Sequence, residues 1–143
     1  MRRRLIYGHC LIAIAMATGC NDSPYHTAPV HGTVTADGKP LFQGKVMFAP
    51  VSKGDVANPG KPAWSKIGKD GTYRLTTFKT EDGAVVGEHW VTVINSAEEL
   101  PEDVEEFARL MLPEKRTVVA GKDNQHDIAL TNAIIEANRE DDR

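Results

Sequence analysis

The sequence is poor in cysteine and in clustered positive charge, and each shortage narrows the class of protein. Only two cysteines, Cys10 and Cys20, occur among 143 residues, which excludes a framework of several disulfides. A domain without disulfides must be held together by packing of its core. The net charge is −3, and no basic cluster occurs after the three arginines at residues 2–4, so nucleic-acid binding is a poor candidate function.

The sequence also lacks an apolar segment long enough to span a bilayer comfortably. Residues 5–17 form a mainly apolar run that Tyr7, Gly8 and His9 weaken, and a spanning helix needs about 20 apolar residues. Three arginines, residues 2–4, precede this segment and small residues follow it, which is the layout of a secretory signal peptide. We therefore predict a signal peptide over residues 1–19. Its removal also takes away Cys10 and leaves a mature chain with a net charge of −6.

The end of this leader predicts a lipid anchor. Residues 17–20, Ala-Thr-Gly-Cys, resemble the lipobox of bacterial lipoproteins, where cleavage precedes a cysteine that carries lipid. We therefore predict lipidation of Cys20, a tether over residues 20–28, and a membrane-anchored domain that faces the periplasm or the cell surface. The alternative is ordinary secretion, with Cys20 as an incidental thiol.

Turn residues divide the remaining chain into short segments. Two Asp-Gly pairs, at residues 70–71 and 82–83, lead into segments in which apolar and polar residues alternate, a strong signal for antiparallel strands. This pattern predicts an all-β fold, a seven-stranded antiparallel Ig-like or transthyretin-like sandwich over residues 29–132. The expected strands are residues 30–35, 44–50, 63–69, 72–77, 89–94, 117–120 and 126–131. The expected inward side chains include Val46, Phe48, Leu75, Val91 and Val93.

Residues 96–112 interrupt the strand pattern. Ser96 and Glu99 resemble a capping box, and Pro101 suits a first helical turn. Apolar residues then recur at helical spacing up to Met111. We therefore predict one short helix inserted between strands, with its body at residues 101–112. The charged residues 133–143 are predicted to form a frayed tail.

Several of these motifs resemble the carboxypeptidase regulatory-like domains, which are transthyretin-like sandwiches. The matching segments are residues 30–34, 37–41, 44–48, 70–75, 82–84, 87–93, 112–115 and 127–130. The lipobox, tether and single domain together are similar to the small lipoproteins of planctomycete-type bacteria. The resemblance implies the fold and an exported location. It implies no activity, because its motifs are turns and core positions.

Candidate catalytic and metal-binding residues are few. His31, His89 and His126 fall on predicted strands and would make a zinc site if they converged, but no pair shows the His-x-His spacing. The transthyretin scaffold also hosts the hydroxyisourate hydrolase, a family that ends in Tyr-Arg-Gly-Ser, whereas residues 140–143 here are Glu-Asp-Asp-Arg. We therefore expect no catalytic site, no metal and no cofactor.

Trp64 and Trp90 are the candidate contact residues for a ligand or partner. With Val91 and Val93 pointing inward, Trp90 points to the other face of its strand. The apolar stripe of the predicted helix would cover Trp90, and this is our expectation, because such a stripe needs somewhere to bury. The alternative is an exposed aromatic patch for a partner or a glycan.

These observations predict a lipid-anchored, non-enzymatic module of the cell envelope that serves binding, adhesion or structural organisation. Its partners would be the membrane, through the anchor, and an envelope protein or glycan. The alternative is a carbohydrate or small-ligand carrier that uses Trp64, Trp90 or the loop of residues 51–62. A transthyretin-like hydrolase is the third hypothesis.

Overall fold

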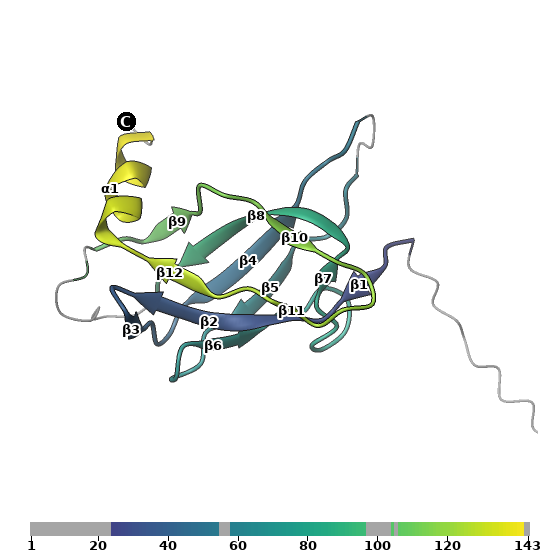
Figure 1. Ribbon diagram of the computed structural model, residues 1–143, viewed down its shortest axis with the longest axis horizontal. Coiled ribbons are helices and arrows are strands. Elements are labelled where there is room, and N and C mark those ends of the chain that lie inside the picture. The colour runs from purple at the N-terminus through teal and green to yellow at the C-terminus, as the bar shows by residue number, and fades with distance from the viewer. Residues whose placement is uncertain (1–23, 55–57, 97–103, 105, 142–143) are drawn as a thin grey trace, which may run out of the picture.

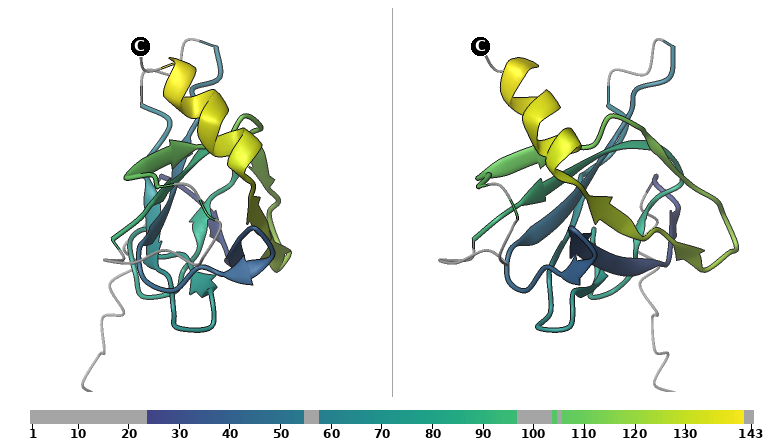
Figure 2. Two further views of the ribbon diagram at one scale, coloured as in Figure 1. Left: turned by 90° about the vertical axis from the view of Figure 1, so that its left-hand side faces the viewer. Right: turned by 60° about the vertical axis from the view of Figure 1, so that its left-hand side comes forward.

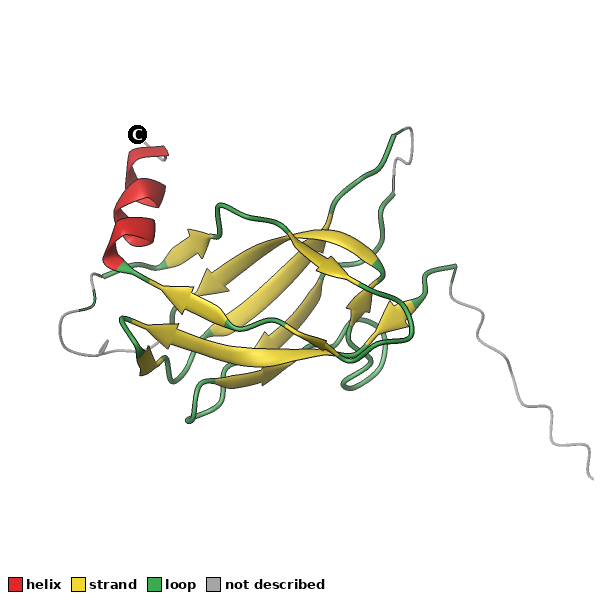
Figure 3. Ribbon diagram, in the orientation of Figure 1, coloured by secondary structure: helices red, strands yellow, loops and turns green. Residues whose placement is uncertain are grey.

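The computed structural model describes residues 24–54, 58–96, 104 and 106–141, where the chain forms twelve short strands and one helix (Figure 1). The predicted signal peptide and Cys20 lie outside these residues, as do residues 97–103 at the front of the predicted helix. No helix in the described ranges has the length and apolar character needed to cross a bilayer. The strands form an open, sandwich-like arrangement, which confirms the all-β prediction (Figures 2 and 3).

Sheet I is antiparallel throughout and contains the longest strand. Its strands are β4 (Lys45–Pro50), β5 (Ala63–Lys66), β8 (Gly87–Ile94), β9 (Arg109–Met111) and β10 (Arg116–Val118). Their order is β10-β8-β4-β5, with β9 also paired to β8. Val46 lies opposite Val93, and Phe48 lies opposite Val91. Because opposite residues share a face, these four buried side chains point into the core together.

Sheet II is built around β2 (Val30–Ala36). Its other strands are β3 (Lys39–Pro40), β6 (Thr72–Arg74), β11 (Asn124–Gln125) and β12 (Ile128–Leu130). Both β11 and β12 run parallel to β2, so the prediction of a purely antiparallel fold is wrong at this edge.

The count of seven strands is also wrong, for two physical reasons. The predicted strand at residues 126–131 is shortened to residues 128–130 and follows a separate pairing, β11, because the Asp127 side chain between them, rather than a strand carbonyl, accepts the Thr33 N–H, at 2.9 Å. Short pairings also form beside turns. The clearest is a separate two-stranded sheet of β1 (Thr27–Ala28) and β7 (Ala84–Val85).

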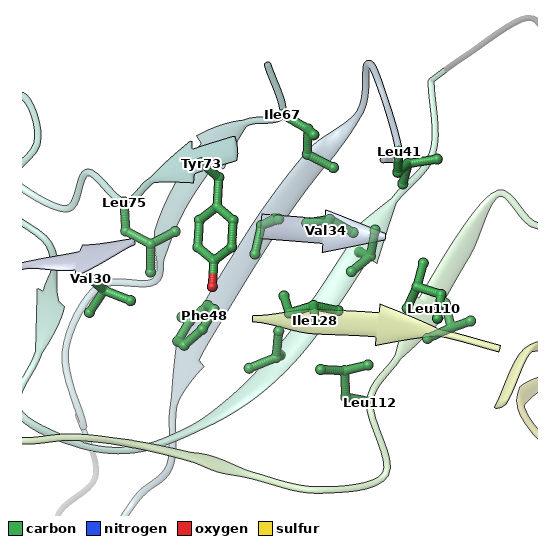
Figure 4. Close-up of a cluster of buried hydrophobic side chains, with 14 of the residues drawn as sticks. Val30, Val34, Leu41, Phe48, Ile67, Tyr73, Leu75, Leu110, Leu112 and Ile128 are labelled. Atoms are coloured by element: carbon green, nitrogen blue, oxygen red, sulfur yellow. The ribbon is translucent and has the colours of Figure 1, made fainter. Parts of the chain in front are cut away.

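The core lies between sheets I and II. The Phe48 ring, from sheet I, lies 6.4 Å from the Tyr73 ring of sheet II, and Val34, Leu75 and Ile128 belong to the same buried cluster (Figure 4). Burying each aliphatic or aromatic side chain of this kind contributes roughly 1.5–3 kcal/mol. All five side chains expected to point inward are buried, so the predicted alternation is confirmed at these positions.

The predicted inserted helix is wrong where the structure describes it. Residue 104 and residues 106–108 are not helical, and residues 109–111 form β9. Leu110 is buried and Met111 is exposed, which is the period of a strand rather than a helix. Pairing with β8 satisfies the backbone while Leu110 joins the core. Leu110 and Met111, which fitted the spacing of a helix, therefore belong to a strand.

The single helix of the described chain, α1 (Asn132–Asp141), lies instead in the segment predicted to be a frayed tail. Thr131 stands just before it, and its carbonyl accepts the Ile134 N–H at 3.0 Å. Ile135 is buried, and the Asn138 side chain accepts the Met111 N–H at 3.0 Å. These contacts hold α1 beside β9, at the end of the molecule opposite β1 (Figure 1).

Candidate functional site

The outer face of sheet I carries both predicted contact residues. One cross-strand row, in register, runs through Trp64, Met47, Thr92 and Met111. Trp90 lies opposite Ala49 on the same face, because it stands two residues before Thr92 on β8. Trp64 is 45% exposed and Trp90 is 39% exposed.

The expectation that a helix covers Trp90 is therefore wrong. Its predicted cover, Met111, lies in β9 in the same sheet and is itself 46% exposed. The alternation that turned Leu110 into the core turned Met111 outward beside Thr92. Sheet I thus has an outer apolar surface on which both indoles are accessible.

The strand geometry sets the spacing of the two tryptophans. Trp90 lies two strands across from Trp64 and two residues along. Strands are about 4.8 Å apart and each residue advances about 3.3 Å, so the two Cα atoms are about 12 Å apart. A ligand that touches both indoles must extend over that length.

Each tryptophan has a lysine against its ring. The Lys45 Nζ atom lies 5.9 Å from the Trp64 ring centroid, and the Lys115 Nζ atom lies 5.0 Å from that of Trp90. At these distances an ammonium group is attracted by the negative face of the ring. Lys45 comes from the neighbouring strand and Lys115 from the connection between β9 and β10.

A second row on the same face is rich in positive charge. It runs through Lys66, Lys45, Ile94 and Arg109 in register. Like charges directly opposite each other on a sheet are destabilising. Within the described residues, none of the three cations in this row is paired with a carboxylate.

These residues define one surface, which we call the cationic aromatic face. It consists of Lys45, Met47, Trp64, Lys66, Trp90, Arg109, Met111 and Lys115. The alternation of strand residues predicted that Trp90 points outward. The cations were missed, because their positions depend on pairing between distant segments. Chemically, the face can pack against flat or ring-shaped apolar groups and attract anions.

The three strand histidines do not converge on one site. His31 lies on the outer side of β2, and its Nε2 atom is 3.0 Å from Asp123 Oδ2. His89 is fully buried and packs against Phe48, as does the His126 ring, each with ring centroids 5.9 Å apart. The described chain contains no group of three or more His, Cys, Asp or Glu side chains arranged to hold a metal.

Burial controls the chemistry of His89. Its Nδ1 atom lies 3.1 Å from the Gly87 carbonyl oxygen, and its buried Nε2 atom has no hydrogen-bond partner. Desolvation lowers the pKa of His89 below its ordinary value of 6.5, and it also lowers the pKa of His126. Both rings are therefore neutral at neutral pH, His89 inside the core and His126 partly buried beside Phe48.

A second feature, which we call the polar groove, was not predicted. This cavity of about 500 Å³ lies where β5 approaches sheet II, and its lining includes His31, Thr33, Lys66, Arg74 and Asp127. Asp127 Oδ1 accepts hydrogen bonds from the N–H and the hydroxyl of Thr33, both at 2.9 Å. These bonds lower the pKa of Asp127. The Asp127 carboxylate is thus held by neighbouring protein groups.

The loop of residues 51–62 is described only in part, because residues 55–57 lie outside the described residues. In the described part, the Asn58 carbonyl accepts a hydrogen bond from the Tyr25 hydroxyl at 3.2 Å. This bond ties the loop to the segment that precedes β1.

Comparison with family models and with curated proteins finds no match. Among solved structures, the chain is similar to a DUF3823 family protein from Parabacteroides merdae, with 15% identity and a TM-score of 0.42. That similarity covers 75% of this chain and 46% of the other. A second is a "putative carbohydrate binding protein" from Pseudomonas aeruginosa, with 10% identity, a TM-score of 0.44, and coverage of 76% and 90%.

A third similar structure is a 9R-lipoxygenase from Cyanothece, with 12% identity and a TM-score of 0.37. The similarity covers 74% of this chain and 16% of the lipoxygenase. The chain thus spans less than half the length of the DUF3823 protein and of the lipoxygenase. At these TM-scores the similarities assign neither a family nor a function, and the carboxypeptidase regulatory-like resemblance stays a prediction.

Proposed function

We propose that this protein is a non-enzymatic, lipid-anchored binding module of the cell envelope, and that its cationic aromatic face binds carbohydrate. One observation carries the proposal: Trp64 and Trp90 lie exposed on the same face of one sheet. Sugar rings offer apolar C–H faces that pack against indoles. Contiguous exposed apolar patches mark interaction sites on soluble proteins.

The spacing of the indoles favours a chain of sugars over a single sugar. Trp64 and Trp90 are about 12 Å apart, which exceeds the width of one sugar ring. Two rings of one oligosaccharide, separated along its length, can each pack against one tryptophan. Met47 lies opposite Trp64 and adds apolar surface next to it.

The composition of the face supports binding without turnover. Glycoside hydrolysis ordinarily uses two carboxyl groups on either side of the scissile bond. Glu88, two residues before Trp90 on β8, is the one acidic residue among the described strand residues on this side of sheet I, so the strands supply no such pair of carboxyl groups. Of the histidines, His89 is fully buried and His31 is paired with Asp123 on the other sheet.

The anchor fits the position of the face. If Cys20 carries lipid, residues 20–27 allow at most about 25 Å between the anchor and the start of β1. β1 and α1 lie at opposite ends of the molecule (Figure 1), and β4 and β8 extend between those ends. The cationic aromatic face would therefore lie along the side of an anchored domain, open to ligands in the envelope.

Titration with a panel of neutral and acidic oligosaccharides, followed by tryptophan fluorescence and calorimetry, tests the binding proposal. We expect Trp64→Ala and Trp90→Ala each to weaken binding at least tenfold. Phe78→Ala is the matched control, because Phe78 is 42% exposed but its ring already stacks on Tyr25, with centroids 6.1 Å apart. No binding across the panel, or equal losses in all three variants, would overturn the proposal.

Metabolic labelling with a lipid precursor tests the anchor. We expect label on the wild type and on Cys10→Ala, because Cys10 lies in the predicted leader. We expect none on Cys20→Ala. Equal labelling of the two variants would show that Cys20 is not the site of lipidation.

A further inference from the structure

The charge pattern of the cationic aromatic face runs against that of the whole protein. The chain carries a net charge of −3, yet the cross-strand row of Lys66, Lys45 and Arg109 contains no acidic residue. Lys66 stands directly opposite Lys45, a placement that costs stability. An anion bound between these side chains would remove that cost.

The cations and the indoles are arranged in pairs. Lys45 lies over Trp64 and Lys115 lies over Trp90, so each aromatic ring has one ammonium group within 6 Å. The two pairs recur at a spacing of about 12 Å. A matching ligand has a repeating unit with an apolar ring face and a negative charge beside it.

We propose, on the basis of the carbohydrate-binding function above, that the ligand is an acidic polysaccharide, with carboxylate or sulfate groups on its sugar rings. Its rings pack on Trp64 and Trp90. Its anionic groups bind Lys45, Lys66, Arg109 and Lys115. The uncharged surface recognises the sugar, and the cations select the charged polymer and speed its association.

Two other anionic partners, a membrane surface and nucleic acid, fit this face less well. Burying either indole in the hydrocarbon of a membrane would carry the adjacent ammonium group into an apolar medium, at high cost. Nucleic acid carries a charge on every phosphate, and its affinity rests on neutralising many of them. A net-negative protein with four cations on its face suits a polymer of lower charge density.

The test uses two polymers with the same sugar backbone, polygalacturonate and its methyl-esterified form, in which each carboxylate is replaced by an uncharged methyl ester. Binding is measured by calorimetry on the wild-type domain at low and high salt. We expect polygalacturonate to bind roughly tenfold more tightly than the ester, the scale of a few exposed ion pairs. We expect this difference to shrink at high salt, because exposed charges are screened.

Substitution of the cations tests whether the preference for the charged polymer comes from the cationic aromatic face. The triple variant Lys45→Gln, Lys66→Gln and Arg109→Gln should lose the preference for polygalacturonate and still bind the ester. Lys79→Gln with Lys122→Gln is the control, because both lysines are exposed outside the strands of sheet I. Thermal melts of all variants verify that they fold.

Each outcome separates this inference from the proposed function. If both polymers bind equally and through the tryptophans, the acidic class is wrong and carbohydrate binding stands. If neither they nor the oligosaccharide panel binds, both proposals fail. Tighter binding to vesicles of phosphatidylglycerol or to single-stranded DNA, lost in the triple variant, would overturn the inference in favour of that polyanion.

Discussion

The outer faces of the two sheets differ in whether their charged groups have partners of opposite charge or hydrogen-bond partners. On sheet II, His31 is paired with Asp123, and Asp127 accepts two hydrogen bonds from Thr33. On sheet I, Lys66 faces Lys45, and two tryptophans remain open. In a stable fold charged groups ordinarily have partners and like charges are kept apart, and departures from this pattern are expected at functional sites. The difference supports the proposal that sheet I is the binding face.

Gly32→Ala should produce the largest effect, by breaking sheet II. An added Cβ atom would lie 2.2 Å from the His126 carbonyl oxygen, which also accepts the Tyr73 hydroxyl. Backbone cannot move aside cheaply, so we expect a loss of about 3 kcal/mol in the free energy of unfolding, the upper end for overpacking. Urea denaturation measures it.

Gly38→Ala is the matched control for that prediction. Gly38 has a φ of +78°, but nothing lies within 4 Å of its added Cβ atom. We expect a loss of about 1 kcal/mol, from backbone strain alone. Equal losses in the two variants would show that the close approach of Gly32 to His126 does not add to the loss in the free energy of unfolding.

Acid should destabilise the core and sheet II in separate pH ranges. The pKa of His89 is lowered by burial, so the unfolded chain binds this proton first. That contribution to stability is complete above the unfolded pKa of 6.5 and is lost as the pH falls below it. The pKa of Asp127 is lowered from 3.8 by its bonds to Thr33, so its contribution is lost only below that pH.

Urea denaturation across this pH range, in wild type, His89→Leu and Asp127→Asn, separates the two contributions. We expect His89→Leu to reduce the loss of stability just below pH 6.5. His126, whose pKa is also lowered, accounts for the remainder there. Asp127→Asn should reduce the loss of stability only below pH 3.8. A wild-type stability that stays constant from pH 7 to about pH 5 would contradict the assignment of His89 as a buried neutral base.

Asp127→Ala and Trp90→Ala should show opposite effects on stability and binding. Asp127→Ala removes two hydrogen bonds from sheet II, so we expect a loss of about 1 kcal/mol in stability and unchanged glycan binding. Trp90→Ala should cost less stability, because the indole is partly exposed, and should abolish most binding. Calorimetric melts and ligand titration of both variants measure the contrast. Equal effects of both variants on binding would refute the division of roles between the sheets.

The strand pattern could be predicted from sequence because it depends on neighbouring residues. Alternation around Phe48 and Val91 placed the core correctly, and with it the outward direction of Trp90. The error at Leu110 and Met111 has a physical origin. Adjacent apolar residues fit one side of a helix, but in β9 they point to opposite faces.

The charged part of the site depends on pairings that no local pattern reveals. Lys66 meets Lys45, and Arg109 joins the same row through Ile94, only after distant segments form a sheet. The helix α1 was missed because its apolar residues are few, with Ile135 the one buried hydrophobic side chain. Thr131 before the helix was a usable signal, since Thr is a favoured residue at that position.

Lys66→Glu should give the smallest change in stability, but one of informative sign. The new carboxylate would stand opposite Lys45, converting a repulsive cross-strand pair into an attractive one. We expect a gain of roughly 0.2–1 kcal/mol at low salt that fades at about 1 M salt, where screening is strong. Lys69→Glu, in an exposed turn outside sheet I, is the control and should gain less.

The same substitution should weaken binding of polygalacturonate, because it places a negative charge on the face that receives the polymer. A variant that is more stable and binds less tightly would mean that Lys66 opposes folding and serves recognition, the trade-off expected of a functional residue. If Lys66→Glu instead lowers stability, or gains no more than Lys69→Glu, the repulsion across β4 and β5 is negligible. The contrast between the two sheets would then rest on the tryptophans alone.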